Sequence, residues 1–240
     1  MRLVNVSALS FDLDDTLWPF QPAVEHAEMA LHSWLVGRAP KTRRILRTWR
    51  NLAELRDDYE RSRPDLVGNF RALRIGSIEL ALKLAEEDVT LVEEAYDVFY
   101  STRQKVDFYE DVWPALTWLS TRFPLVAVTN GNADLRLTGG AEFFRDAFSA
   151  RALGIAKPEA GIFHAAAKGA GVSAAELLHV GDDFHLDFLG ALNAGLQAVW
   201  LIRENHLEGK HLGHSACRPH LSIHNLSVLC RALGGPAHLA

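Results

Sequence analysis

Short apolar segments with little polar alternation recur along this chain, and helical patterns separate them. The clearest segments are residues 8–13, 125–129, 177–181 and 198–202, and a weaker one is 147–153. Strands that are apolar on both faces are typical of a parallel sheet covered by helices on each side. Helical patterns at 112–122, 159–168 and 187–194 supply such helices. The sequence therefore predicts an α/β fold with a Rossmann-like, doubly wound parallel sheet.

The stretch between residues 19 and 109 differs, because it contains no convincing strand and its apolar residues recur at helical spacing. One stripe is Val24, Ala27, Leu31, Trp34 and Leu35, and further helical patterns fall at 45–59, 77–85 and 91–100. Such stripes allow helices to bury one face each against their neighbours. We therefore expect two domains: an α/β core of residues 1–18 and 110–240, and an inserted helical bundle of residues 19–109.

Composition narrows the function classes. The 240 residues include 25 Lys and Arg against 30 Asp and Glu, a net charge of -5. The chain thus lacks the basic surface typical of proteins that bind nucleic acid or anionic membranes. No apolar run approaches the roughly 20 residues that cross a bilayer, and the first one leads into acidic residues rather than a cleavage site. With two cysteines, Cys217 and Cys230, we expect a cytoplasmic protein without nucleic-acid or membrane partners; the oligomeric state is not indicated.

Three acids directly follow the first predicted strand: Asp12, Asp14 and Asp15, with Thr16 behind them. Ligands of open α/β sheets bind beyond the carboxyl ends of the strands, so these carboxylates lie where chemistry is expected. Crowded carboxylates repel one another unless they share a cation. A helix cap needs one side-chain oxygen, so Asp15 fits capping as well as catalysis, whereas Asp12 and Asp14 are better explained as site residues.

Two weaker signals follow later strands. Thr129 closes the segment 125–129, and Asn130 and Gly131 form a tight turn beyond it. A hydroxyl beside backbone N–H groups can bind an anionic oxygen, although such a turn is common in proteins. Lys157 precedes Pro158 at the start of a predicted helix, a place where a lone lysine is typically a solvated surface residue.

A second strand end also carries acids: Asp182, Asp183 and Asp187 follow the segment 177–181. Hard oxygen ligands brought together from two strand ends, with room for water, are the ligands that Mg²⁺ prefers. Asp187 has an alternative place in the first turn of the next helix, where the helix dipole favours a negative charge. The sequence therefore predicts a magnesium site between the two strand ends.

In this order, the four groups resemble the motifs of the haloacid dehalogenase-like hydrolases. The matching positions are Asp12-x-Asp14-x-Thr16, Thr129-Asn130, Lys157-Pro158 and Gly181-Asp182-x4-Asp187. The resemblance spans essentially the whole chain and implies that the helical insert is a cap of the C1 type. Residues 12–17, 128–133 and 179–187 look like the bacterial flavin mononucleotide (FMN) phosphatases, whose branch also acts on 5-amino-6-(5-phospho-D-ribitylamino)uracil in riboflavin biosynthesis. The resemblance implies an Mg²⁺-dependent phosphatase for a small phosphorylated metabolite.

The resemblance also implies a role for each matching residue. Asp12 is the nucleophile that forms a phosphoaspartyl intermediate, and Asp14 is the acid and then the base. Thr129 binds a phosphoryl oxygen and Lys157 balances negative charge. The Asp12 carboxylate, the Asp14 backbone carbonyl and Asp182 hold Mg²⁺. The supporting residues are Asp187, which orients Lys157 or metal-bound water, Asp183, which is an extra ligand or a helix cap, and Asn130 beside Thr129.

Substrate choice is expected in the cap and in the loop after the first strand. Trp18 has two interpretations: it stacks on a flat ring of the substrate, or it packs at the hinge of the cap. Arg71 and Arg74 are candidates to reach a second polar group of the substrate, and surface arginines of this kind are common. Asn132 follows the turn at Asn130 and is a candidate lining residue.

Several alternatives stay open at this point. Other small phosphate esters, such as a sugar phosphate, phosphoglycolate or a nucleotide, fit the same motifs. Asp14 argues against a 2-haloacid dehalogenase, since displaced halide needs no proton, and the intact acids argue against a catalytically silent binding protein. The histidines of the C-terminal tail raise the question of zinc, but they complete no known zinc pattern. These histidines are His206, His211, His214, His220 and His224.

Overall fold

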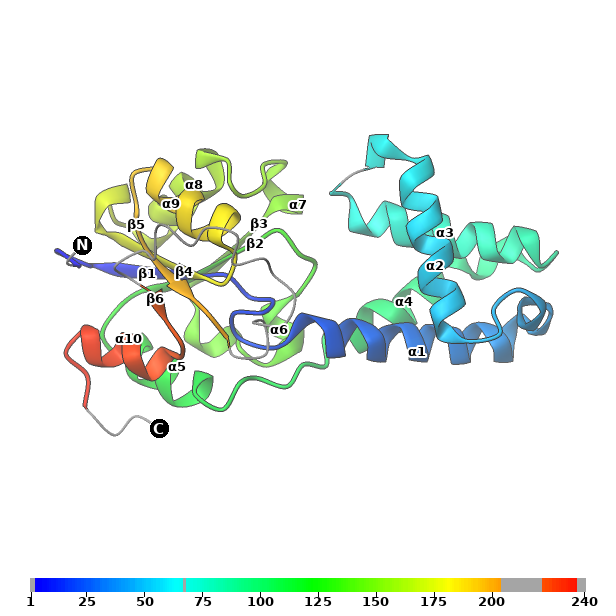
Figure 1. Ribbon diagram of the computed structural model, residues 1–240, viewed down its shortest axis with the longest axis horizontal. Coiled ribbons are helices and arrows are strands. Elements are labelled where there is room, and N and C mark those ends of the chain that lie inside the picture. The colour runs from blue at the N-terminus through cyan, green and yellow to red at the C-terminus, as the bar shows by residue number, and fades with distance from the viewer. Residues whose placement is uncertain (1–2, 67, 204–221, 237–240) are drawn as a thin grey trace. The chain divides into compact units, whose positions relative to one another are not determined.

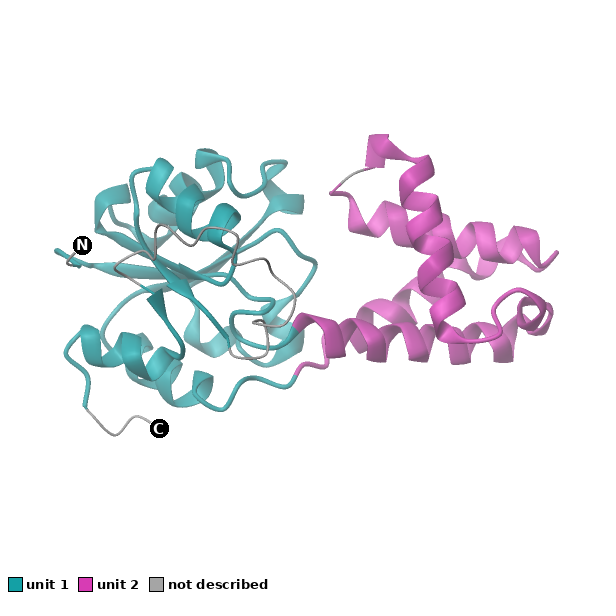
Figure 2. Cartoon of the chain, viewed as in Figure 1, with its two compact units in different colours: residues 1–19, 107–240 teal, residues 20–106 magenta. Residues whose placement is uncertain are grey.

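The computed structural model describes residues 3–66, 68–203 and 222–236 of the chain. It divides into two compact units, residues 1–19 with 107–240 and residues 20–106 (Figure 2). The boundaries predicted from the sequence lie at 18–19 and 109–110.

The first unit is built on a six-stranded parallel sheet with the strand order β3-β2-β1-β4-β5-β6 (Figure 1). The strands are β1 (Ala8–Phe11), β2 (Leu125–Thr129), β3 (Asp146–Ser149), β4 (Leu177–Gly181), β5 (Gln197–Leu201) and β6 (Ser222–Ile223). β1, β2 and β4 are buried along their whole length, as strands covered on both faces must be. The predicted α/β fold with a parallel sheet is confirmed.

Helices flank both faces of this sheet. They are α5 (Val112–Ser120), α6 (Leu135–Thr138), α7 (Ala150–Leu153), α8 (Ala160–Ala170), α9 (Gly190–Asn193) and α10 (Leu226–Ala232), with short 3-10 turns at Ala141–Phe143 and Ala174–Glu176 and a π-helical turn, η6, at Phe184–Leu189. α8 and α9 cover one face, and α5 and α10 cover the other (Figure 1). Because all strands run in one direction, their carboxyl ends meet at one edge. Asp12, Thr129 and Asp182 lie at this edge.

The second unit consists of α1 (Phe20–Arg38), α2 (Trp49–Ser62), α3 (Phe70–Leu84) and α4 (Val92–Arg103), with 3-10 turns at Pro40–Arg44, Pro64–Leu66 and Val89–Leu91. Apolar residues of all four helices form its core, among them Leu31, Leu52, Ile78 and Phe99. α3 begins earlier than the predicted residue 77, because the Asn69 side chain accepts a hydrogen bond from the Ala72 amide and caps the helix there. No helix in the described part of the chain is long and apolar enough to span a membrane.

The predicted strand at 147–153 is wrong in its second half. β3 ends at Ser149, whose side chain accepts from the Ala152 amide at 3.2 Å and starts α7. Gly154, with φ of +67°, then ends this helix. A local cap and a glycine thus decide the structure of a segment whose apolar pattern favoured a strand.

The C-terminal part of the chain is described only from residue 222. It contains β6 and α10, and Cys230 is a buried free thiol. His224 Nδ1 lies 3.3 Å from the Ile202 carbonyl oxygen. The other tail residues of the sequence analysis lie outside the described residues: His206, His211, His214, Cys217 and His220.

Arg203, which follows β5, is buried and connects several segments of the first unit. Its guanidinium donates to both carboxylate oxygens of Asp111, at 2.7 and 2.9 Å, and twice to the Thr16 carbonyl oxygen, at 2.7 and 3.2 Å. Asp111 also accepts from the Leu226 amide at 2.6 Å. The Tyr109 ring lies 4.2 Å from the guanidinium carbon. One side chain therefore fixes the loop after β1 against the first residues of α5 and α10.

Arg203→Ala is expected to lower the free energy of unfolding by about 3–5 kcal/mol, because it leaves the Asp111 carboxylate without its charged partner in a largely buried place. Urea denaturation measures this loss. Arg151→Ala removes an exposed arginine from α7 and is the matched control, with an expected change below about 0.5 kcal/mol. If Arg203→Ala behaves like this control, the anchoring role is wrong.

Candidate active site

The loop that follows β1 turns back sharply and places two carboxyl groups at the edge of the sheet. The Asp12 amide still donates to the Val180 carbonyl at 2.9 Å, so pairing with β4 continues to this residue. Asp15 then adopts a left-handed conformation with φ of +61°, and its amide donates to the Trp18 carbonyl at 2.7 Å. Aspartate tolerates this conformation better than most residues. Asp15 therefore shapes the turn, while Asp12 is buried and Asp14 is half-buried beside it.

Lys157 is a buried partner of two carboxylates. Its Nζ donates to Asp12 Oδ1 at 2.5 Å and to Asp187 Oδ1 at 2.6 Å. The side-chain amide of Asn130 holds the backbone of Lys157, accepting from its N–H at 2.8 Å and donating to its carbonyl at 3.0 Å. The structure thus brings these four predicted residues together, and it gives Asn130 the task of positioning Lys157.

The charges of this cluster shift one another. Burial raises the pKa of Asp12 well above its usual range, and the carboxylates of Asp187 and Asp182 add to this effect while Lys157 opposes it. Burial also acts to raise the pKa of Asp187, but Lys157 and the bond from His179 outweigh it and hold this pKa well below the usual range. Burial lowers the pKa of Lys157 less than the two carboxylates raise it, so the ammonium form is stabilised. In this cluster the Asp12 carboxyl group is therefore costly to ionise, whereas the Asp187 carboxyl group ionises readily.

The loop after β2 lies against Asp14. Thr129 is buried, and its Oγ1 accepts from the Gly131 amide at 2.9 Å. A Cβ atom at position 131 would come within 2.7 Å of Asp14 Oδ2 and 3.3 Å of Thr129 Oγ1, so the backbone of Gly131 lies close to both side chains. The Asp14 carboxyl and the Thr129 hydroxyl therefore line the same small region beside Asp12.

Trp18 is fully buried, and its ring packs edge-on against Phe108 with the centroids 5.0 Å apart. Its Nε1 donates to Asp14 Oδ1 at 2.8 Å. Of the two interpretations of this tryptophan, the structure favours the packing role. The contact with Asp14 adds a function that the sequence did not indicate, because the indole orients the second acid.

Three carboxylates at this edge, those of Asp12, Asp182 and Asp187, have oxygens within 4.8 Å of one another and could hold a metal ion. The Thr16 hydroxyl lies between two of them, 3.5 Å from Asp12 Oδ2 and 3.3 Å from Asp182 Oδ1. Oxygen donors with excess negative charge suit a hard divalent cation. Asp187 accepts three hydrogen bonds, from Lys157, His179 and the Asp183 amide, and is largely committed to these partners. Asp12 and Asp182 as ligands of the cation stay a prediction. The Asp14 carbonyl as a further ligand stays a prediction.

Asp183 and Asp187 have different tasks. Asp183 Oδ1 accepts from the amides of His185 and Leu186, at 2.8 and 2.9 Å, and so caps the π-helical turn η6. Its own amide donates to Asp187 Oδ2 at 3.0 Å. Of the two predicted roles of Asp183, the structure favours the helix cap. Asp187 pairs with Lys157, which agrees with the first of its two predicted roles, the orientation of Lys157.

The chain matches the family model of the haloacid dehalogenase-like hydrolases over residues 6–195. This match covers all four motif groups of the site. The chain is a haloacid dehalogenase-like hydrolase. The predicted family and the prediction that the chain is an enzyme are confirmed.

Two relatives of this hydrolase are phosphatases. It is 33% identical over 233 residues to the 5-amino-6-(5-phospho-D-ribitylamino)uracil phosphatase of Escherichia coli, covering 95% of this chain and 96% of the relative. It is 30% identical over 208 residues to the glyceraldehyde 3-phosphate phosphatase of Methanopyrus kandleri, covering 82% and 84%. Among solved structures, a 2-haloacid dehalogenase from Pseudomonas syringae is 36% identical, with a TM-score of 0.81 and coverage of 95% of this chain and 98% of the other.

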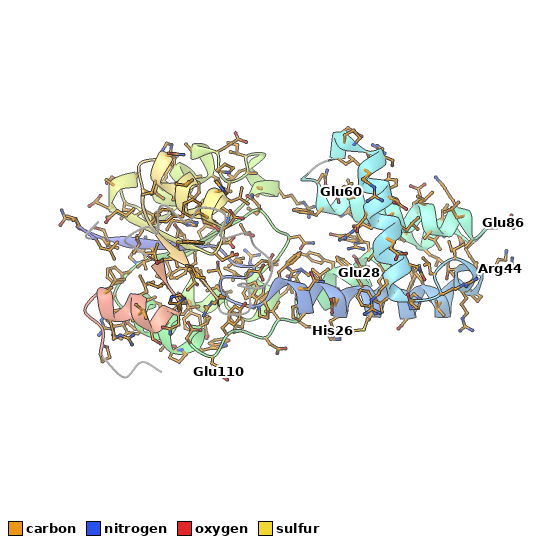
Figure 3. All side chains as sticks on the ribbon, viewed as in Figure 1. His26, Glu28, Arg44, Glu60, Glu86 and Glu110 are labelled. Atoms are coloured by element: carbon orange, nitrogen blue, oxygen red, sulfur yellow. The ribbon has the colours of Figure 1, made fainter. Side chains whose placement is uncertain are left out.

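The remaining candidates for substrate contact make other interactions. Arg74 of α3 is buried, pairs with Glu28 of α1 at 2.7 Å, and lies 3.9 Å from the centre of the Phe99 ring. Figure 3 labels Glu28 on α1. Arg71 pairs with Glu93 at 2.7 Å. Both arginines thus pair with acids of their own helical unit, and their role toward a substrate stays a prediction. Asn132, which is half-buried after β2, stays a candidate as well.

Two residues beneath the site were not among the predicted ones: Ser10 on β1 and His179 on β4. Their side chains bond to each other, and His179 Nε2 lies 3.1 Å from Asp187 Oδ1. The available signal was the presence of one polar residue in each of two otherwise apolar strands, because a buried polar side chain requires a partner.

Proposed function

We propose that this hydrolase is an Mg²⁺-dependent phosphomonoester hydrolase that acts through a phosphoaspartyl intermediate on Asp12. The observation that carries this proposal is the second carboxyl group, Asp14, held by Trp18 beside the Asp12–Lys157 pair. An alkoxide leaving group needs a proton, and a positioned carboxylic acid supplies it. The two phosphatase relatives support the same reaction class.

Asp12 and Asp14 have different tasks in the proposed reaction. An Asp12 carboxylate oxygen forms a bond to phosphorus while the bond from phosphorus to the ester oxygen breaks, and Asp14 donates its proton to that oxygen. Asp14, now ionised, accepts a proton from the water that attacks phosphorus, and the bond from Asp12 to phosphorus then breaks. Trp18 fixes the acid through Oδ1, so we assign the proton transfers to Oδ2, which faces Gly131. Thr129 and Lys157 bind the phosphoryl oxygens.

Asp12 and Asp182 would hold Mg²⁺, with the Asp14 backbone carbonyl as a further proposed ligand. When bound, the ion offsets the repulsion between the carboxylates and a phosphate group. The crowding that raises the pKa of Asp12 is a reason for such a cation, because a positive charge there favours the ionised nucleophile.

The proposed substrate is FMN or 5-amino-6-(5-phospho-D-ribitylamino)uracil, which would place the enzyme in riboflavin biosynthesis in the cytoplasm. The latter is the substrate named for the relative from Escherichia coli, which matches nearly the full chain. We propose that the helical unit is a cap of the C1 type that admits small molecules. Sugar phosphates, phosphoglycolate and nucleotides are the alternatives within the same reaction.

A second candidate is 2-haloacid dehalogenation, which the solved dehalogenase structure from Pseudomonas syringae favours. In that reaction the carboxylate nucleophile displaces halide, and no acid has to protonate the leaving group. The Asp14–Trp18 arrangement would then have no task in the chemistry.

The test is a panel of substrates assayed for phosphate release and, with 2-chloropropionate, for chloride release. The panel contains both flavin-related esters, sugar phosphates, phosphoglycolate and nucleotides, each with Mg²⁺ and with EDTA. We expect Mg²⁺-dependent phosphate release, led by a flavin-related ester. A different leading ester would contradict the proposed substrate and leave the reaction in place. Chloride release without phosphate release would contradict the proposed reaction.

A further inference from the structure

Ser10 and His179 are register partners in the middle of the sheet, and both are fully buried. Their neighbours along β1 and β4 are apolar, for example Leu9, Phe11 and Val180. A polar group buried without a hydrogen bond costs free energy, so this pair requires an explanation. Ser10 Oγ lies 2.9 Å from His179 Nδ1, and His179 Nε2 lies 3.1 Å from Asp187 Oδ1.

The chemistry of these groups fixes the direction of each hydrogen bond. The Asp187 carboxylate can only accept, so His179 carries its proton on Nε2 and donates it there. Burial lowers the pKa of His179, which favours the neutral ring. In that ring Nδ1 is an acceptor, and the Ser10 hydroxyl donates to it. Ser10 thus selects the tautomer that Asp187 needs.

Asp187 is held from several sides. Its Oδ1 accepts from Lys157 and from His179, and its Oδ2 accepts from the Asp183 amide. A Cβ atom at Gly181 would come within 2.3 Å of the Asp187 Cγ, so the backbone of β4 packs directly against the carboxyl group. His179 and Lys157 donate to the same atom, Asp187 Oδ1. The bond from His179 therefore acts on the oxygen that holds the Lys157 ammonium group.

We propose that His179 is a positioning residue for the reaction: with Ser10 behind it, it orients Asp187, and Asp187 orients the Lys157 ammonium toward Asp12. This role rests on the proposed function. The ring of His179 also packs against Phe163, with the centroids 5.1 Å apart, so a plain packing role is the alternative that the test must separate.

The first part of the test compares His179→Gln, which keeps a donor in the place of Nε2, with His179→Leu, which keeps volume alone. We expect His179→Leu to lower kcat by about 10–100-fold, and KM to change far less, since the effect is on the reacting groups. His179→Gln is expected to recover most of the lost kcat. His164→Leu is the matched control, because His164 on α8 bonds to the Ala194 carbonyl away from the site. Equal kcat values for the Gln and Leu variants would overturn the proposal.

The second part needs no substrate, so it separates this proposal from the proposed function. Nitrogen NMR of the imidazole at neutral pH is expected to show the proton on Nε2, and Ser10→Ala is expected to weaken that preference. The Lys157 ammonium resonance is expected to persist in His179→Gln and to be lost or shifted in His179→Leu. A proton on Nδ1 in the wild type, or a Lys157 resonance unchanged in His179→Leu, would overturn the positioning role even if every ester in the panel is hydrolysed.

Discussion

Asp12→Asn is expected to lower kcat for phosphate release by about 10⁴-fold or more, because the amide oxygen is a poor nucleophile and every later step depends on the first bond. The same substitution is expected to leave the metal-free protein at least as stable as the wild type. An acid whose pKa is raised on folding opposes folding once it is ionised, and Asp12 is such an acid. A neutral side chain of the same shape removes this cost at neutral pH. Steady-state kinetics and thermal melting in EDTA measure the two effects.

The control for Asp12→Asn is Asp134→Asn, the same change at a residue that caps α6 by accepting from the Arg136 amide at 2.9 Å. Asparagine caps helices about as well as aspartate, so activity and melting temperature should both stay near the wild-type values. Substantial steady-state hydrolysis by Asp12→Asn would contradict the role of Asp12. A large fall in its melting temperature would contradict the explanation from charge crowding.

Lys157→Met is expected to damage both activity and folding. It removes the ammonium group that Asp12 and Asp187 share, and it leaves two buried carboxylates close together. Breaking a buried ion pair from one side costs about 3–5 kcal/mol of folding free energy. Turnover should also fall, because a phosphate group would meet these carboxylates without the lysine. Urea denaturation and the assay with the leading ester measure both losses.

The stability loss in Lys157→Met should depend on pH in a defined direction. The pKa of Asp187 is lowered on folding, so its stabilising contribution is present above its ordinary pKa of 3.8 and is lost as the pH falls further. The pKa of Lys157 is raised, so its contribution is present below the ordinary value of 10.5 and is lost only at higher pH. Both contributions are complete at pH 7, and the loss is therefore largest there.

Near pH 4 the unpaired carboxylates of the Lys157→Met variant can bind protons, and the difference from the wild type should shrink. Lys168→Met removes an exposed lysine of α8 and should show little loss at either pH. A loss for Lys157→Met that is equal at pH 4 and pH 7 would contradict the account of the shared ammonium group.

The sequence predicted the sheet and the residues at its edge, because both depend on the order of apolar and polar residues over short segments. Buried strands such as 125–129 are continuous apolar runs, and the polar residues that end them are conspicuous. The order of the motif residues along the chain carries the family resemblance, and this resemblance implies that Asp12, Thr129 and Lys157 belong to one site. The family resemblance supplied their roles, which spacing alone does not contain.

Other features depend on side-chain orientation and could not be read from pattern. Trp18 was as consistent with a substrate contact as with packing, and the bond from its indole to Asp14 appears only when the turn at Asp15 is built. The sequence is consistent with a surface position for Arg74, and only the structure shows that this arginine is buried and pairs with Glu28 of α1. At Ser149 a single cap hydrogen bond decides between strand and helix, and an apolar pattern does not report such a bond.

We propose that Asp12 carries the phosphoryl group during turnover, and chemical trapping can detect the group on this residue. The leading ester is mixed with the enzyme and Mg²⁺, the reaction is quenched, and borohydride reduces any acyl phosphate, so that the modified residue is found by peptide mass spectrometry. Asp14→Asn, which should slow both the formation and the release of the phosphoryl group, is run beside the wild type with a longer incubation. We expect homoserine at position 12 and nowhere else. Continued turnover of the ester with no modification at Asp12 in either protein would contradict it.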